Sequence, residues 1–122
     1  MVCGGSILKV ADNSGARKVR CIRVAGKKFG TVGDKVVLSV RAVTGDILRM
    51  KVTKGEVVQG VIVRAKKGIV RDCGSWVSFD DNAVVIVSAK GSPLGTRVLG
   101  PIGRGVKEEG FNEVVSLSMV TV

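Results

Sequence analysis

Three clusters of basic side chains are the residues of this sequence best suited to a chemical task. They are Arg17-Lys18-Val19-Arg20, Lys27-Lys28, and Arg64-Ala65-Lys66-Lys67, and Arg71 follows the last of them. Each cluster lies at the end of an expected strand or beside glycine, where long side chains can reach outward. Lys and Arg at such places neutralise phosphates and release condensed counterions, which gives strong, salt-sensitive binding. The clusters therefore predict a polyanionic partner.

The charge is distributed unevenly along the 122 residues, of which twenty are Lys or Arg and ten are Asp or Glu, for a net +10. Residues 1–72 contain sixteen of the basic residues and five acidic ones, whereas residues 73–122 contain four and five. A surface that serves only solubility does not require this asymmetry. We expect one part of the domain to be electropositive and another part to be nearly neutral.

The residue types needed for catalysis or metal binding do not occur together in this chain. It has no His, so it lacks the commonest general base and the commonest metal ligand. Its three cysteines are too far apart in sequence for metal-ligand spacing and are expected to be free thiols. The Asp80-Asp81 pair is expected to form a turn or to pair with Lys and Arg. We predict that the protein is not an enzyme and holds neither a metal nor a cofactor.

Aromatic side chains are few, which bears on the kind of nucleic acid that the chain could bind. Of the three Phe and one Trp, only Phe29, beside Lys27-Lys28, is placed to stack on a base. Proteins that bind single strands usually stack bases on several exposed rings. Scarce rings and abundant Lys and Arg favour folded RNA bound through its backbone.

The elements that must position these side chains are short. Seventeen glycines separate segments rich in Val and Ile, a pattern typical of many short strands joined by tight turns. The Thr44–Asp46 and Asp72–Ser75 segments have the composition of hairpin turns. We expect strands at Ser6–Val10, Lys18–Val24, Lys35–Val43, Ile47–Thr53, Glu56–Ala65, Trp76–Phe79 and Ala83–Ser88.

The chain changes character after Ser88, where Gly and Pro recur too often for a long element. Val106–Gly110 and Glu113–Met119 each have room for one or two helical turns. The whole pattern predicts one mainly β domain, with a small β-barrel over residues 1–90 and an irregular or helical part over residues 91–122. The longest apolar run, Ala83–Val87, is too short to cross a membrane, and no membrane partner is expected.

Several segments resemble one known family, that of the large-ribosomal-subunit protein numbered fourteen. The first match is Leu8-Lys9-Val10-Ala11-Asp12-Asn13-Ser14-Gly15-Ala16, and the most specific is Gly60-Val61-Ile62-Val63-Arg64-Ala65-Lys66-Lys67-Gly68. Pro93-Leu94-Gly95-Thr96-Arg97, Gly100-Pro101 and Val115-Ser116-Leu117 continue it in order. The resemblance implies a five-stranded β-barrel with a projecting hairpin and a short helical C-terminal part.

The resemblance also implies a function and partners. It implies a structural constituent of the large subunit that binds large-subunit rRNA, lies beside neighbouring large-subunit proteins and faces small-subunit rRNA across the interface. It further implies a docking surface for a factor that silences unjoined large subunits. The alternative is a free RNA-binding barrel, such as a translation factor or an RNA chaperone.

Two sets of site residues follow from the basic clusters and the resemblance. For rRNA binding we expect Asn13, Ser14, Arg17, Lys18, Arg20, Lys27, Lys28, Lys51, Lys54, Arg64, Lys66, Lys67 and Arg71. For the intersubunit and factor-docking surface we expect Thr96, Arg97, Arg104, Lys107 and Glu113.

The C-terminal part departs from the family pattern. Gly105-Val106 replaces a helix-favouring pair, and Glu108, Glu109 and Glu113 occupy a region that is usually more basic. Glycine at position 105 costs about 1 kcal/mol of helix propensity relative to Ala. These departures suggest a divergent lineage, so the ribosome in question is expected to be mitochondrial, with a bacterial one as the alternative.

Overall fold

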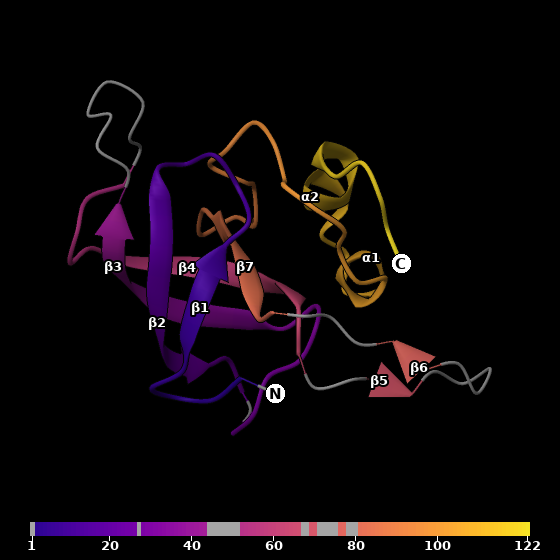
Figure 1. Ribbon diagram of the computed structural model, residues 1–122, viewed down its shortest axis with the longest axis horizontal. Coiled ribbons are helices and arrows are strands. Elements are labelled where there is room, and N and C mark those ends of the chain that lie inside the picture. Colours follow the sequence, from indigo (N-terminus) through magenta and orange to yellow (C-terminus); the bar gives the residue numbers. More distant parts are fainter. Residues whose placement is uncertain (1, 27, 44–51, 67–68, 71–75, 78–80) are drawn as a thin grey trace.

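The fold is a closed β-barrel followed by two short helices (Figure 1). The computed structural model describes residues 2–26, 28–43, 52–66, 69–70, 76–77 and 81–122. Neighbouring strands of the barrel follow the order β1-β2-β3-β4-β7, with bounds at Ile7–Val10, Ala16–Val24, Lys35–Val43, Val57–Arg64 and Ala83–Val87. The predicted mainly β fold with a five-stranded barrel is confirmed.

The barrel closes where its first strand meets its last. β1 runs parallel to β7, with Lys9 opposite Ala83 and Val10 opposite Val84. The other four strand pairs of the barrel are antiparallel. Asp12, directly after β1, reinforces the seam because its Oδ2 accepts a hydrogen bond of 3.0 Å from the backbone N–H of Ile86.

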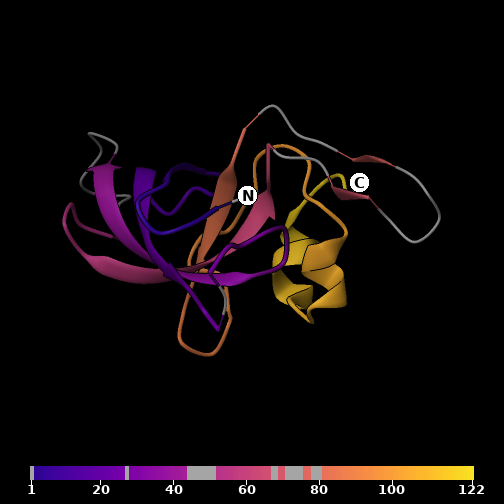
Figure 2. The same cartoon turned by 90° about the horizontal axis from the view of Figure 1, so that it is seen from below.

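A two-stranded sheet stands away from the barrel, on the side where the helices lie (Figures 1 and 2). It pairs β5 (Ile69–Val70) with β6 (Trp76–Val77). The expected strand at Trp76–Phe79 is therefore present in part, and β5 was not expected. The expected hairpin turns at residues 44–46 and 72–75 lie outside the described residues, as does most of the expected Ile47–Thr53 strand. Val52 and Thr53, which are described, are not in a strand.

Two buried clusters lie on opposite faces of β4 and β7. Ile62, Val84 and Ile86 point into the barrel and join the cluster that fills it. Val61, Val63 and Val85, which alternate with them, point outward into a second cluster, as the period of two in a strand requires. β7 and the second half of β4 are therefore buried on both faces, as their Val- and Ile-rich sequences allow.

The C-terminal part supplies the other side of the second cluster. α1 (Gly105–Glu108) and α2 (Asn112–Leu117) lie one or two residues from their expected positions. Val106 and Val114, one from each helix, are fully buried against the outer side of β4 and β7, as is Ile102 just before α1. Within the described part of the chain, neither helix is long and apolar enough to span a membrane.

Close approach of backbone explains the glycine at the start of α1. A Cβ on Gly105 would lie 2.8 Å from the carbonyl oxygen of Val32, and a Cβ on Gly33 would lie 2.6 Å from the carbonyl oxygen of Gly105. Gly33 also has a φ of +94°. Glycine at position 105 lowers the helix propensity, but it allows the backbone of α1 to pack tightly against the turn before β3.

Candidate nucleic-acid interface

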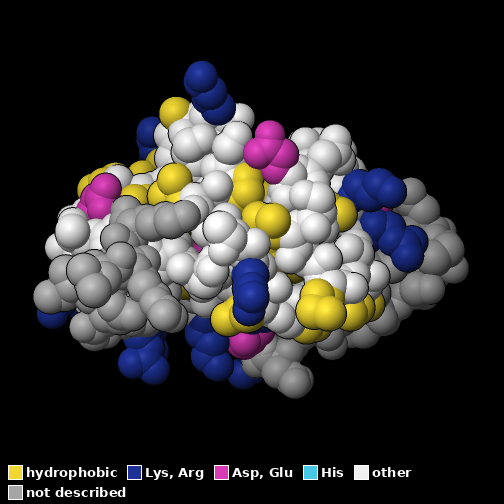
Figure 3. Space-filling view, turned by 90° about the horizontal axis from the view of Figure 1, so that it is seen from above, with side chains coloured by type: hydrophobic (Ala, Val, Ile, Leu, Met, Phe, Trp, Pro, Cys, Tyr) yellow, Lys and Arg dark blue, Asp and Glu magenta, His cyan; other side chains and the backbone are white. Residues whose placement is uncertain are grey.

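The outer surface of β1, β2 and β3 carries cations from adjacent strands, and we call it the basic face. Its members are Lys9 on β1, Arg17, Lys18 and Arg20 on β2, and Arg41 on β3, all of which are exposed. On the face seen in Figure 3, Lys and Arg side chains likewise project mainly from the periphery, with apolar side chains between them. The five cations of the basic face come from the N-terminal part of the chain, where the sequence concentrates Lys and Arg.

The register of β1 and β2 places two like charges opposite each other. Lys9 pairs with Lys18 in the antiparallel ladder. Cβ atoms of such cross-strand partners lie about 4.5–5.5 Å apart, and like charges at this spacing destabilise a sheet. Lys9 has an acidic neighbour, because its Nζ lies 3.9 Å from Asp81 Oδ2, but its side chain is 66% exposed. The paired, exposed positions of Lys9 and Lys18 leave both side chains accessible to a bound anion.

Irregular register in β2 explains why consecutive basic residues are all exposed. Regular alternation would turn every second residue inward. The pairing of β2 with β3 shifts between Ala16 and Lys18, and again between Lys18 and Val19. The first shift leaves Arg17 as an extra residue on β2, and the second leaves Arg41 as one on β3. Arg17 and Lys18 therefore both face solvent while Ala16 and Val19 are buried.

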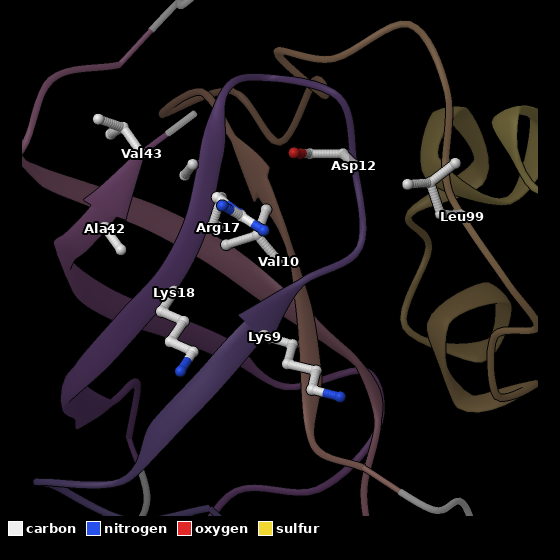
Figure 4. A pocket seen from close by; sticks show the side chains of 9 residues that line it. Lys9, Val10, Asp12, Arg17, Lys18, Ala42, Val43 and Leu99 are labelled. Carbon is white, nitrogen blue, oxygen red and sulfur yellow. The ribbon is translucent and has the colours of Figure 1, made fainter. Parts of the chain in front are cut away.

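A groove of about 620 Å³ opens beside these residues (Figure 4). Its cationic lining is Lys9, Arg17 and Lys18, and its apolar lining comes from β1, β2, β3 and the C-terminal segment. The apolar residues are Val10, Ala16, Ala42, Val43 and Leu99, and Asp12 completes the lining. The groove thus combines phosphate-binding side chains with apolar surface.

The turn after β1 is held by its own side chains. Ser14 is fully buried, and its hydroxyl donates to Asp12 Oδ1 at 2.6 Å. Its backbone N–H donates to the same oxygen at 3.1 Å. The Ser14 side chain was expected to contact rRNA, but its position does not support that expectation because the hydroxyl is used inside the protein.

Asn13, by contrast, is exposed and joins two regions that the sequence analysis treated as separate. Its Nδ2 donates to Thr96 Oγ1 at 2.8 Å, and its Oδ1 accepts from the backbone N–H groups of Thr96 at 2.7 Å and Arg97 at 3.1 Å. An expected rRNA-binding residue therefore supports two of the expected docking residues. The Thr96 and Arg97 side chains are themselves exposed.

Arg64 is used within the chain. Its Nε donates to Asp81 Oδ1 at 2.9 Å, and its Nη1 donates to the carbonyl oxygens of Leu99 at 2.8 Å and Pro101 at 3.3 Å. The side chain is only 12% exposed. Its geometry does not support the expected phosphate contact, because these bonds tie the end of β4 to the C-terminal segment.

The remaining expected rRNA-binding residues lie apart from the groove or cannot be placed. Lys28, Lys54 and Lys66 are exposed. Lys28 Nζ lies 6.0 Å from the centroid of the Phe29 ring, within reach of a cation–π contact. Four expected residues lie outside the described part of the chain: Lys27, Lys51, Lys67 and Arg71.

The other expected docking residues are carried by the C-terminal helices. Arg104 precedes α1, Lys107 lies in α1, and Glu113 lies in the first turn of α2. All three are exposed. Glu113 lines a second hollow, of about 280 Å³, together with Lys90 and Phe111. Thr96 and Arg97 are thus held through Asn13, which follows β1. Arg104, Lys107 and Glu113 instead lie next to or within the two helices.

Three residues of the interface were missed by the sequence analysis. Lys9 and Arg41 stand alone in apolar segments, and Leu99 is 57% exposed in a glycine-rich stretch. An isolated Lys in an alternating strand signals a solvent-facing position. Only the pairing of β1 with β2 reveals that this position faces another lysine.

The thiols that the structure describes are unpaired, and one of them is buried. Cys3 and Cys21 are free, and burial of Cys21, with a smaller effect from nearby Cys3, raises the pKa of the Cys21 thiol. A raised pKa disfavours the reactive thiolate. Among the residues that the structure describes, no three His, Cys, Asp or Glu side chains are grouped to hold a metal ion.

The comparison with known families agrees with this geometry. The chain matches the family model described as ribosomal protein L14p/L23e over residues 1–122. The match supports a structural role in the large ribosomal subunit and does not favour a free RNA-binding module. A cationic strand face without a catalytic group is consistent with such a role. This chain belongs to the ribosomal protein L14p/L23e family.

Proposed function

We propose that the protein binds large-subunit rRNA through the basic face, with the RNA backbone as the main ligand. The observation that carries this proposal is the pairing of Lys9 with Lys18 across the β1–β2 ladder. The protein alone keeps these charges side by side at a cost. A phosphate bound near both ammonium groups would remove that cost and release counterions.

The arrangement favours a folded RNA read by shape. The cations of the basic face come from three adjacent strands, so they form a patch with a fixed spacing. Described aromatic side chains do not line the groove beside it, whereas proteins that bind extended single strands use rings as stacking platforms. Backbone contacts position a protein on RNA without reading a base sequence.

The salt dependence of binding tests this proposal. We expect the double variant Lys9→Gln and Lys18→Gln to lower the slope of log K against log salt by about 1.4–1.8, since each lost phosphate contact contributes about 0.7–0.9. The matched control is the double variant Lys90→Gln and Lys107→Gln, at two exposed lysines away from the groove. It should change the slope much less. The probe is a large-subunit rRNA fragment in filter-binding titrations. Equal changes in the two double variants would reject the basic face as the specific site.

A second contact surface is favoured by the hydrogen bonds of Asn13. Because Asn13 holds the backbone of both Thr96 and Arg97, the Arg97 guanidinium starts from a fixed turn and suits a bidentate contact with carboxylate or phosphate. We assign this turn, together with Arg104, Lys107 and Glu113, to contacts with small-subunit rRNA and with a ribosome-silencing factor.

The charge-reversed variant Arg97→Glu tests the second surface. We expect it to enter large subunits at the normal stoichiometry and to lose factor binding, as measured by sedimentation of subunits with added factor. Arg23→Glu, at an exposed arginine of β2 that belongs to neither contact surface, is a control for the general effect of charge reversal. Exclusion of the Arg97 variant from subunits would instead assign this arginine to the rRNA contact.

For the compartment in which the protein works, we keep the mitochondrial ribosome as the proposal and the bacterial ribosome as the alternative. Sedimentation of ribosomes from mitochondrial or bacterial extracts, followed by detection of the protein in the large-subunit fraction, tests it.

A further inference from the structure

The groove beside the basic face has more apolar surface than a phosphate backbone can cover. Val43 is partly exposed, and the Leu99 side chain is 57% exposed at its rim. The outside of an RNA duplex offers sugars and phosphates, whereas an unpaired nucleotide also offers the two apolar faces of its base. The groove volume of about 620 Å³ lies within the range of about 300–1,000 Å³ that is typical of small-molecule sites.

The positions of the lining side chains match the parts of a nucleotide. Figure 4 shows Leu99 on one side of the groove, Ala42 and Val43 on the other, and Arg17 between them, while Lys9 and Lys18 lie together at one end. The apolar side chains can contact the faces of a base, and a guanidinium such as that of Arg17 can stack on it. The two ammonium groups lie where they can bind its phosphates.

Electrostatics favour a nucleotide over a peptide as the occupant. Among the described residues that line the groove, three are cations and one, Asp12, is a carboxylate that is 5% exposed. Both oxygens of that carboxylate already accept hydrogen bonds, Oδ1 from Ser14 and Oδ2 from Ile86. The carboxylate is thus turned into the protein, and an anion in the groove meets mainly cations.

The backbone of Leu99, at the rim of the groove, is held by two hydrogen bonds. Its backbone N–H donates to the carbonyl oxygen of Ala11 at 2.5 Å, and its carbonyl oxygen accepts from Arg64 Nη1 at 2.8 Å. A rim that is fixed in this way binds without first being ordered, which reduces the entropic cost of binding. Arg64 acts here as a positioning residue for the groove.

We infer that the groove seats one unpaired nucleotide of the bound RNA, its base beside Leu99 and the Arg17 guanidinium and its phosphates at Lys9 and Lys18. The inference rests on the proposed rRNA binding and adds a selective element to it. A folded RNA with a bulged or looped-out nucleotide would then bind more tightly than a continuous duplex of nearly the same charge.

Two RNA probes test the seat directly. One is a short RNA duplex with a single bulged adenosine, and the other is the same duplex without the bulge. Fluorescence anisotropy with the full chain should show about fivefold tighter binding of the bulged duplex. Leu99→Ala truncates an exposed side chain. It should abolish the roughly fivefold preference for the bulged duplex and leave the affinity for the plain duplex unchanged. Val57→Ala, at a site 63% exposed and outside the groove, should keep the preference.

The failure of the seat and the failure of the proposed function give different results. Lys18→Gln should weaken the binding of both duplexes and lower both salt slopes, and this outcome reports on the basic face alone. If the wild-type protein binds both duplexes equally while Lys18→Gln still lowers the slopes, the seat is overturned and the basic face stands. If Leu99→Ala weakens the binding of both duplexes to the same extent, the seat is overturned as well, because Leu99 would then contact the duplex itself.

Discussion

The two sides of the barrel wall differ in what lies against them. Outside β4 and β7 we define a covered face, which consists of Val61, Val63, Ala83, Val85 and Val87 and is buried under the C-terminal part. Outside β1, β2 and β3 lies the basic face, over which the described residues place no helix (Figure 1). Burial of apolar side chains stabilises a fold, whereas exposed cations do not. We conclude that stability and RNA binding are largely carried by different sides, and the following changes test that separation.

The largest loss of stability is expected from the middle of the covered side. Ile102 is fully buried, and Ile102→Ala should lower the free energy of unfolding by about 2–5 kcal/mol, because it removes buried methyl groups and leaves a cavity. Ile7→Ala, at a site 54% exposed beside the basic face, should cost less than about 1 kcal/mol. Urea unfolding followed by circular dichroism measures both values. Similar losses in the two variants would show that the two sides do not differ as the burial pattern indicates.

The joint between barrel and helix should be almost as sensitive. Gly33→Ala would bring a Cβ against the carbonyl oxygen of Gly105 and strain a φ of +94°, so we expect it to cost about 3 kcal/mol. Gly55 has a comparable φ of +88° and open space around it. Gly55→Ala therefore carries the strain without the clash and should cost about 1 kcal/mol. Thermal unfolding of both variants isolates the contact, and equal costs would argue against it.

Arg64 lies at the boundary of the two sides, and a charge-preserving change assigns it to one of them. Arg64→Lys keeps the cation but loses the planar fork that binds Asp81, Leu99 and Pro101 at the same time. We expect the free energy of unfolding to fall by about 1–2 kcal/mol. The salt slope of RNA binding should stay the same, because the structure uses this side chain internally. A lowered slope with unchanged stability would return Arg64 to the RNA interface.

The smallest effect is a gain in stability on the basic face. Lys18→Gln removes the repulsion from Lys9 and should raise the free energy of unfolding by a few tenths of a kcal/mol at low salt. The gain should shrink at about 1 M salt, where the Debye length is about 3 Å. Lys18→Arg, which preserves the charge, should show no such salt-dependent gain in chemical unfolding. A destabilised Lys18→Gln protein would mean that the lysine stem contributes more by packing than its charge costs.

Local sequence predicted the elements well and the use of individual side chains less well. Val- and Ile-rich segments between glycines identify the barrel strands, because period and composition are local properties. The run Arg64 to Lys67 reads as one basic cluster in the sequence, but the described part divides it. Arg64 points to carbonyl oxygens that lie 35 and 37 residues further along the chain, whereas Lys66 is exposed. Hydrogen-bond partners this far apart in sequence depend on the tertiary structure and cannot be predicted from the neighbouring residues.

Bulges and strand register account for most of what could not be predicted about the site. Regular alternation cannot expose Arg17 and Lys18 together, and the shifts that do so arise in the pairing with β3. The Lys9–Lys18 pair depends in the same way on the β1–β2 register. Ser14 was expected to contact rRNA, but its hydroxyl donates to the buried carboxylate of Asp12.

The parallel seam between β1 and β7 has a consequence for the synthesis of the protein. Lys9 reaches its partner Ala83 only after the intervening residues have been translated, which takes several seconds at about 5–20 residues per second. Throughout that interval, the most basic segment of the chain is exposed without a closed barrel to hold it. Pairing over such a separation also slows folding, because the entropy of a long loop is lost before the contact forms. A nascent chain of this design is prone to capture by any nearby polyanion, so timely escort to its assembly site would matter more for this protein than for one whose strands pair in sequence order.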